Sequence, residues 1–232
     1  GITHNIKIIE DAAQGIGATY KNRPLGTIGD IGCLSFHDTK NISCGEGGTI
    51  FINDTSLKLK AEILREKGTN RAAYFRGEID RYGWKSLGSS YLLSDILAAK
   101  LLSQLEALEQ ITQRRKIIWQ HYYDSLQSLE SDGKCRLPII PEYANHNGHM
   151  FYLVCNNEKE RSDLITHLRK NKIQSTFHYL SLHKSEFFKK KYEGDNLSNS
   201  DRFTHCLLRL PLYPILIKDD QDYIIEKINK FY

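Results

Sequence analysis

The chain has 232 residues, of which 40% are hydrophobic and 26% are charged, and its formal net charge is +4. A chain of this length can bury the core of one or two globular domains. The net charge is too small to predict a nucleic-acid-binding surface, and no apolar run is long enough to cross a bilayer. We therefore expect a soluble globular protein with no nucleic-acid or membrane partner, whose anionic partners are small molecules.

The five cysteines argue against structural cross-links. They are odd in number, widely spaced and never in a Cys-x-x-Cys arrangement, which disfavours both a disulfide framework and a zinc site. A reducing compartment fits such a set, so we expect a cytoplasmic protein. The residues are Cys33, Cys44, Cys135, Cys155 and Cys206.

The first half of the chain alternates strand-like and helix-like patterns. Residues 6–9, 31–36 and 48–52 are short apolar or β-branched runs that predict buried strands. Residues 57–66 carry apolar side chains at helical spacing and are followed by Gly68, which is typical of a helix end. Strands mixed with helices predict an α/β sheet.

A long helix is predicted next. Ser94 supplies its start, and an apolar stripe that begins at Leu97 predicts one helix continuing towards Leu129. The Ser-Asp-Gly sequence at 131–133 then ends the helix.

The same Ser-Asp-Gly sequence marks the expected domain boundary. Residues 1–130 would form the large domain with its connecting helix, and residues 131–232 a smaller α+β domain. Within the smaller domain we expect strands at 150–155 and 173–179 and helices at 161–170 and 220–231.

Two residues of complementary chemistry follow neighbouring predicted strands. Asp11 follows the first strand and Lys40 follows the second, and open α/β sheets bind ligands at the carboxyl ends of their strands. A lysine amine bonds the aldehyde of pyridoxal phosphate (PLP), and a carboxylate beside its pyridine nitrogen keeps that nitrogen protonated. Gln14 and Ser35 are able to contact the ring hydroxyl and the phosphate. Taken singly each residue is more typical of a loop, strand or solvated surface, but their joint order favours a PLP site.

The residues around this pair resemble a known family. The strings EDAAQG at 10–15, SFHDTKN at 35–41 and GEGG at 45–48 are similar to those of sugar-nucleotide aminotransferases of the DegT/StrS type, which have the type I PLP aminotransferase fold. The resemblance spans nearly the whole chain. It continues through REKGTNR at 65–71, YGW at 82–84, GSSYLLSD at 88–95, FHYLSLH at 177–183 and RLPL at 209–212.

The resemblance implies a role for each cofactor residue. Lys40 would be the Schiff-base lysine and Asp11 the partner of the pyridinium nitrogen. Gln14 would contact the ring, and Ser35 would bind the phosphate. Many family members have Asn at the position of Ser90, where it reaches the phosphate bound by the neighbouring subunit, so the resemblance also implies a homodimer.

The implied substrates are a sugar nucleotide and an amino acid donor. His178 and His183 would line the sugar-nucleotide entrance, and because they lack a carboxylate or thiolate complement we expect no metal site. The strings at 68–71 and 88–91 resemble the subgroup that forms dTDP-4-amino-4,6-dideoxygalactose. This implies transfer of an amino group from L-glutamate to dTDP-4-keto-6-deoxyglucose, in the biosynthesis of surface polysaccharide.

Two other functions remain open from the sequence. Dehydratases of the same family act on keto sugars with PLP, but they use a histidine at the position of Lys40, which argues against this alternative. The second alternative is a non-catalytic binding module that retains the fold. It remains because the chain begins with Gly1 and its only methionine is Met150, so we expect a fragment. Such a fragment would lack an upstream phosphate-binding helix end, expose apolar surface and bind PLP poorly.

Overall fold

The computed structural model describes residues 2–232, which form two compact units. Unit 1 comprises the residues up to Gln110 together with Glu142–Asn147, and unit 2 comprises Ile111–Pro141 and Gly148–Tyr232. The division falls before the boundary that we predicted at residue 131. That domain boundary stays a prediction, because compactness alone does not test which parts fold independently.

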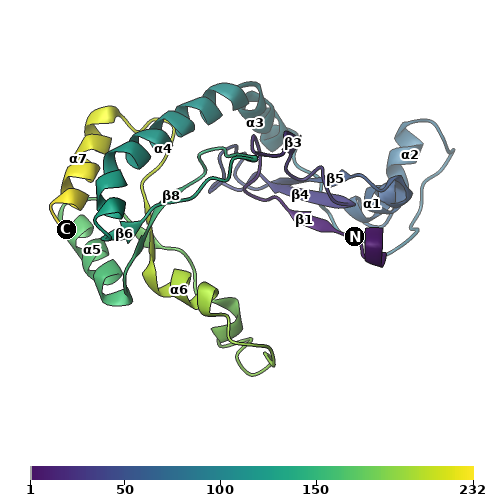
Figure 1. Cartoon of the computed structure of the whole chain (residues 1–232). Helices are drawn as coiled ribbons and strands as arrows, with labels where there is room; N and C mark the ends of the chain where they lie inside the picture. The colour runs from purple at the N-terminus through teal and green to yellow at the C-terminus, as the bar shows by residue number, and fades with distance from the viewer. Residues whose placement is uncertain (1) are drawn as a thin grey trace. The chain divides into compact units, whose positions relative to one another are not determined.

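Unit 1 combines short strands with short helices, as the sequence predicts. Its elements are η1 (Ile2–His4), β1 (Ile9–Asp11), β2 (Thr19–Tyr20), β3 (Arg23–Pro24), β4 (Ile31–Ser35), β5 (Gly48–Ile52), η2 (Thr55–Leu57), α1 (Lys58–Arg65), α2 (Arg71–Phe75), α3 (Asp95–Glu106) and β7 (Ala144–Asn145). Strand β4 is the centre of a three-stranded sheet, in which β1 runs parallel to it and β5 antiparallel (Figure 1). Strands β3, β2 and β7 form a second small sheet.

The first predicted strand is displaced along the chain. Strands β4 and β5 confirm the predictions at 31–36 and 48–52, but β1 begins at Ile9 and not at residue 6. The two residues before Ile9 bond to the side chain of Asp30, which comes just before β4: its carboxylate accepts from Ile8 N at 2.8 Å and from Lys7 Nζ at 3.1 Å. As a result Asp11 is the last residue of β1, rather than a residue after it.

Helix α1 confirms the helix predicted at 57–66, and Gly68 lies just beyond its end. Gly68 has a φ of +72°, and a Cβ atom there would lie 1.8 Å from Ser86 O. Only glycine fits both conditions. The close approach lets residues 86–91 run beside the end of α1, where Lys67 N donates to Ser89 O and Tyr91 N donates to Arg65 O.

The single long helix predicted from Ser94 is two helices in the structure. Ser94 is the N-cap of α3, as predicted, and its Oγ accepts from Leu97 N at 3.4 Å. Helix α3 ends before Ala107, whose φ of −94° and ψ of 6° leave the helical region, and α4 (Leu108–Ser131) follows. The prediction of one helix was wrong because the apolar spacing continues across this break. The predicted end of α4 is confirmed, and Gly133 has a φ of +68°.

Unit 2 is an antiparallel sheet packed against helices. Besides α4 it contains β6 (Cys135–Arg136), β8 (Phe151–Cys155), α5 (Glu158–Lys170), β9 (Thr176–Phe177), η3 (Leu182–Lys184), α6 (Ser198–Cys206), β10 (Leu207–Leu210) and α7 (Lys218–Asn229). The strand order is β6-β8-β10-β9. The α+β architecture predicted for this part is confirmed, although α6 and β10 were not predicted. Helix α5 also begins earlier than expected, because Asn157 caps it by accepting from Glu160 N at 2.9 Å.

Unit 2 has a closed apolar core. Helices α4, α5 and α7, which lie next to one another in Figure 1, contribute side chains that pack with those of β8 and β10. Tyr122, Phe151, Leu164 and Leu208 are fully buried. These apolar faces explain why the second half of the chain folds around this sheet.

A buried arginine lies in unit 2. The Arg115 guanidinium donates to the main-chain oxygens of Gly148 (3.0 Å), His149 (2.8 Å) and Leu212 (3.2 Å). Burial lowers the pKa of Arg115 to about 10, so the group still carries its charge at neutral pH. Main-chain oxygens therefore accept the hydrogen bonds of this buried cation. These bonds connect the first part of α4 to the segments next to β8 and β10.

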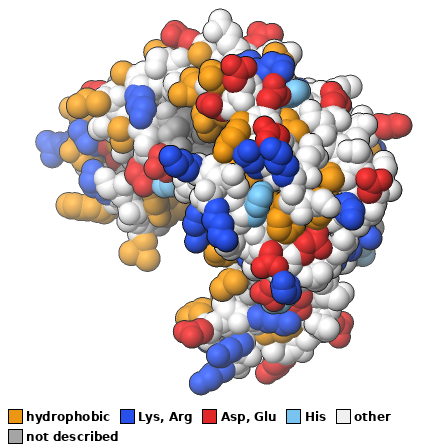
Figure 2. All heavy atoms as spheres, turned by 90° about the vertical axis from the view of Figure 1, so that its left-hand side faces the viewer, with side chains coloured by type: hydrophobic (Ala, Val, Ile, Leu, Met, Phe, Trp, Pro, Cys, Tyr) orange, Lys and Arg blue, Asp and Glu red, His pale blue; other side chains and the backbone are white. Residues whose placement is uncertain are grey.

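The surface carries charges of both signs. Figure 2 shows one face, on which Lys and Arg side chains are interspersed with Asp and Glu and with apolar side chains. Within residues 2–232, no helix is both long enough and apolar enough to cross a membrane.

Candidate functional site

Strand register places two of the predicted cofactor residues on one face of the sheet in unit 1. Asp11 of β1 lies opposite Cys33 of the parallel strand β4, and Ser35 is two residues further along β4. Successive side chains of a strand point to opposite faces, so Asp11, Cys33 and Ser35 share a face. Asp11 and Ser35 are also the last residues of their strands. A carboxylate and a hydroxyl therefore lie on one face at the carboxyl edge of the sheet, where α/β folds bind ligands.

The Asp11 carboxylate is set by a turn that begins within β1. Its Oδ1 accepts from Ala13 N at 3.1 Å, and Gly15 N donates to Ala12 O at 2.7 Å. Ala12 is buried and holds this turn against the sheet, while Asp11 is exposed. Asp and Asn commonly stabilise such turns by binding a main-chain N–H two residues on. The turn leaves the carboxylate accessible to a ligand.

The neighbouring Glu10 has a different role. It alternates with Asp11 along β1 and accepts from Gly26 N, Ile28 N and Gly29 N. Burial acts to raise the pKa of the Glu10 carboxyl, but the hydrogen bonds from these three amides outweigh it, and the pKa lies below its ordinary value. Glu10 is thus an ionised anchor for the 26–29 turn on the opposite face of the sheet from Asp11.

Lys40 lies in a closed loop between β4 and β5. Lys40 N donates to His37 O at 3.0 Å, and Cys44 N donates to Phe36 O at 3.0 Å. Phe36 and Ile42 are buried and anchor the loop on both sides of the lysine. The Lys40 side chain is half-buried, and in the described part of the chain it has no carboxylate partner. Its amine is therefore held on the carboxyl side of β4 without being neutralised by an ion pair.

Two buried asparagines connect these loops, and neither was predicted from the sequence to be a site residue. Asn147 Nδ2 donates to Gln14 O and Ile16 O, and Asn41 Nδ2 donates to Asn147 O. Asn41 lies inside a string that we singled out, but no sequence signal marks Asn147, which is more than one hundred residues from its partners. The Gln14 side chain itself is exposed.

Ser90 is also in unit 1, on the segment beside α1. It is exposed and forms an isolated antiparallel bridge with Glu66. The same part of the chain exposes large apolar side chains, including Trp84 at 84% and Leu87 at 90%. Asp11, Gln14, Ser35, Lys40 and Ser90 thus all belong to one compact unit.

The two predicted sugar-binding histidines belong to unit 2. His178 is half-buried, and burial, helped by the charge of Arg209, lowers its pKa below the ordinary value. The His183 side chain is 8% exposed, with its Nε2 3.3 Å from Asp201 Oδ1 and its ring 5.3 Å from that of Tyr192. Their roles in substrate binding stay predictions. Among residues 2–232, no group of three or more metal-ligating side chains is assembled.

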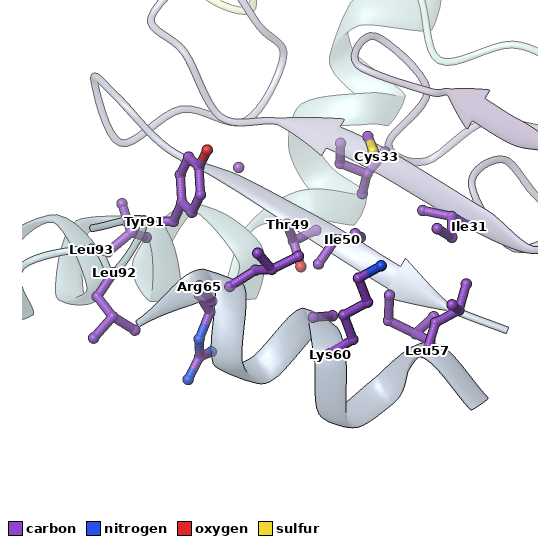
Figure 3. A pocket seen from close by; sticks show the side chains of 15 residues that line it. Ile31, Cys33, Thr49, Ile50, Leu57, Lys60, Arg65, Tyr91, Leu92 and Leu93 are labelled. Carbon is purple, nitrogen blue, oxygen red and sulfur yellow. The ribbon is translucent and has the colours of Figure 1, made fainter. Parts of the chain in front are cut away.

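An apolar hollow of about 940 Å³ lies on the sheet of unit 1 (Figure 3). Helix α1 and strands β4 and β5 form its walls, with residues 91–93 at one end. Cys33 is on the same sheet face as Asp11 and Ser35, and it lines the hollow together with Ile31 and Ile50. The polar edge of the sheet therefore continues into apolar surface.

The whole described chain has known relatives. The sequence pattern of the DegT/DnrJ/EryC1/StrS aminotransferase family matches residues 2–229. The spore coat polysaccharide biosynthesis protein SpsC of Bacillus subtilis is 31% identical over 235 residues, covering 97% of this chain and 60% of SpsC.

Solved structures have the same fold. A DegT/DnrJ/EryC1/StrS aminotransferase from Brucella abortus is 29% identical, with a TM-score of 0.86 over 99% of this chain and 58% of its own. Spr1654 of Streptococcus pneumoniae, assigned as a sugar aminotransferase and solved in its PLP form, is 26% identical, with a TM-score of 0.83 over 97% of this chain and 57% of its own. The chain spans about 60% of the length of the curated relatives it matches.

Proposed function

Because this chain belongs to the DegT/DnrJ/EryC1/StrS aminotransferase family, we propose that the full-length protein is a PLP-dependent sugar aminotransferase. The observation that carries the proposal is the strand register. It puts the Asp11 carboxylate and the Ser35 hydroxyl on one face at the carboxyl edge of adjacent parallel strands, with Lys40 in the loop that follows.

The side chains present fit this cofactor. PLP has an aldehyde, a pyridine nitrogen and a phosphate, and when bound it supplies an electron sink for the carbon that loses a proton. Lys40 Nζ would hold the aldehyde carbon, the Asp11 carboxylate would keep the pyridine nitrogen protonated, and Ser35 Oγ would donate to the phosphate. Gln14 would contact the ring.

Lys40 would also move the proton. When its amine is not bonded to the cofactor, Lys40 would be a base within the site. The absence of a carboxylate partner in the described chain supports this role, because an ion pair would hold the amine in its charged form. By keeping the ring nitrogen protonated, the Asp11 carboxylate would let the ring take up the negative charge that develops on the substrate carbon.

The proposed substrates are L-glutamate and a 4-keto-6-deoxy sugar nucleotide, with dTDP-4-keto-6-deoxyglucose as the first candidate. Two relatives support this class: SpsC is named for the biosynthesis of a polysaccharide, and Spr1654 is assigned as a sugar aminotransferase. We assign His178 and His183 to the sugar-nucleotide entrance. The lowered pKa of His178 favours a neutral ring. A neutral imidazole has one nitrogen that donates a hydrogen bond and one that accepts, so it would be able to bond sugar hydroxyls in either way.

One experiment tests the function. Full-length protein is incubated with PLP, reduced with borohydride and digested, and we expect the reduced cofactor on the peptide that contains Lys40. The same protein, given L-glutamate and dTDP-4-keto-6-deoxyglucose, is expected to form 2-oxoglutarate and a dTDP-linked amino sugar, measured by mass spectrometry. Label on Lys21 or Lys67, or no label, would contradict the assignment.

We further propose that the protein is a homodimer in which Ser90 reaches the phosphate of the partner's cofactor. The exposed apolar side chains of Trp84, Leu87 and Tyr91, near Ser90, support an interface there. Ser90→Ala is expected to weaken PLP retention by a few-fold, since one hydrogen bond contributes about 1 kcal/mol. Equilibrium dialysis measures retention, and sedimentation measures the oligomer.

Ser89→Ala is the control for this prediction. It changes the neighbouring exposed serine and should leave PLP retention unaltered. A fully active monomer would rule out the proposal.

A further inference from the structure

Three hydrogen bonds join the two loops that carry Asp11 and Lys40. Asn147 Nδ2 donates to Gln14 O at 2.7 Å and to Ile16 O at 2.8 Å, and Asn41 Nδ2 donates to Asn147 O at 3.1 Å. Gln14 is three residues from Asp11, and Asn41 is the residue after Lys40. The links therefore connect the segment that follows Asp11 to the residue next to Lys40.

The chemistry of these links requires an amide. Asn147 is 4% exposed and Asn41 is 7% exposed, so water does not replace the bonds easily. An asparagine side chain has two N–H donors, and Asn147 directs its Nδ2 at two main-chain oxygens. A carboxylate of the same shape has no donor and would be repelled by both oxygens. Buried polar groups that lose a partner are costly, so the arrangement is specific for asparagine.

The segment that carries Asn147 is fixed independently of its side chain. Strand β7 pairs with β2, and Lys21 N donates to Tyr143 O at 2.8 Å. The rings of Tyr20 and Tyr143 also contact each other edge to face, at 5.3 Å between centroids. These contacts would remain if the Asn147 side chain were removed. The Asn147 side chain is consequently not the main element that attaches residues 142–147 to unit 1.

A rigid cofactor makes the spacing between the two loops important. Its pyridine nitrogen and its aldehyde are fixed on one ring, so Asp11 and Lys40 must be held at a matching separation. The pairing of β1 with β4 fixes the ends of these two strands, but Lys40 lies five residues beyond the end of β4, and the contacts of each residue with its own turn do not set the separation. The hydrogen bonds through Asn147 and Asn41 join one turn to the other.

We propose that Asn147, assisted by Asn41, is a positioning residue that sets the separation between the Asp11 carboxylate and the Lys40 amine. This inference rests on the proposed function, because it assumes that one cofactor contacts both residues. It adds a residue from beyond α4 to a proposed cofactor site whose other members lie within the first 90 residues of the chain.

The test compares Asn147→Ala and Asn147→Asp with the wild type in the full-length protein. Both variants are expected to lower kcat by about 10–100-fold, because a displacement of a reacting group by about 1 Å has an effect of this size. KM for the sugar nucleotide should change less than about twofold. The circular dichroism of the bound cofactor's visible band, which depends on ring orientation, should also change. Loss of stability alone would alter neither the kcat-to-KM split nor this band in the folded fraction.

Asn156→Ala is the matched control. Asn156 Nδ2 also donates to two main-chain oxygens, those of Gly133 and Lys134, both at 3.0 Å, but it belongs to unit 2. It should leave kcat and the dichroic band unchanged. If Asn147→Ala does not fold, Asn41→Asp, which removes the donor to Asn147 O, is expected to give the same kinetic and dichroic changes.

The outcomes separate the two proposals. Wild-type protein that carries the reduced cofactor on Lys40, with variants whose kcat and dichroic band equal those of the wild type, would overturn this inference alone. Wild-type protein with no cofactor on Lys40 would overturn the proposed function, and this inference with it.

Discussion

Replacing Lys40 by alanine is expected to abolish covalent attachment of PLP and to lower turnover by about a thousandfold or more. The lysine would supply both the amine that bonds the cofactor and the base that moves the proton, and general acid–base catalysis alone typically contributes about 10²–10⁴-fold. The loss should appear in kcat. Borohydride labelling and the amino-transfer assay, both on full-length protein, measure the two effects separately.

Lys40→Arg separates charge from nucleophilicity. The guanidinium keeps the positive charge in the loop but does not deprotonate at neutral pH, so it neither bonds the aldehyde nor accepts a proton. We expect it to be as inactive as Lys40→Ala. If either variant kept wild-type turnover, the covalent bond and the proton transfer would have to be assigned to another residue.

Asp11→Asn is expected to retain the cofactor and to lower turnover by about 10²–10³-fold. The Asn side-chain oxygen is still able to accept from Ala13 N, so the turn after β1 should persist. The neutral amide no longer holds the pyridine nitrogen protonated, and losing one such electrostatic interaction costs about 3–4 kcal/mol in the transition state. Steady-state kinetics on the PLP-loaded protein measures the change.

The control for Asp11→Asn is Asp80→Asn, which removes the charge of an exposed carboxylate elsewhere in unit 1. Its turnover should equal that of the wild type. Unchanged turnover in Asp11→Asn would exclude this carboxylate as the partner of the ring nitrogen.

Local patterns predicted much of the fold. Strands β4 and β5 were found because short apolar runs bounded by turn residues are typical of strands, and α1 was found from its spacing and from Gly68. The start of β1 was misplaced because three isoleucines look alike in sequence, whereas the Asp30 carboxylate decides which of them lies in the strand. The break at Ala107 has no local signal, since the apolar stripe continues on both sides.

The candidate site was predictable where its residues are close in sequence. Asp11, Gln14, Ser35 and Lys40 lie within two short strings, and their resemblance to a family provided the chemistry. Asn147 was missed because its hydrogen bonds to the Gln14 loop depend on chain reversals that no local pattern encodes. The buried pairing of His183 with Asp201 was missed for the same reason, since α6 was not predicted.

The bonds of Asn147 also impose an order on synthesis. Asn147 is 133 positions from Gln14 and 131 positions from Ile16 in the sequence. Strands β1, β4 and β5, in contrast, all lie within the first 52 residues. Ribosomes add about 5–20 residues per second, so on the order of ten seconds pass between translation of Gln14 and translation of Asn147. Strands β1, β4 and β5 have time to pair during that interval, but the main-chain oxygens of Gln14 and Ile16 still lack the Asn147 donor. The separation of Asp11 and Lys40 would therefore be set only after α4 has been translated.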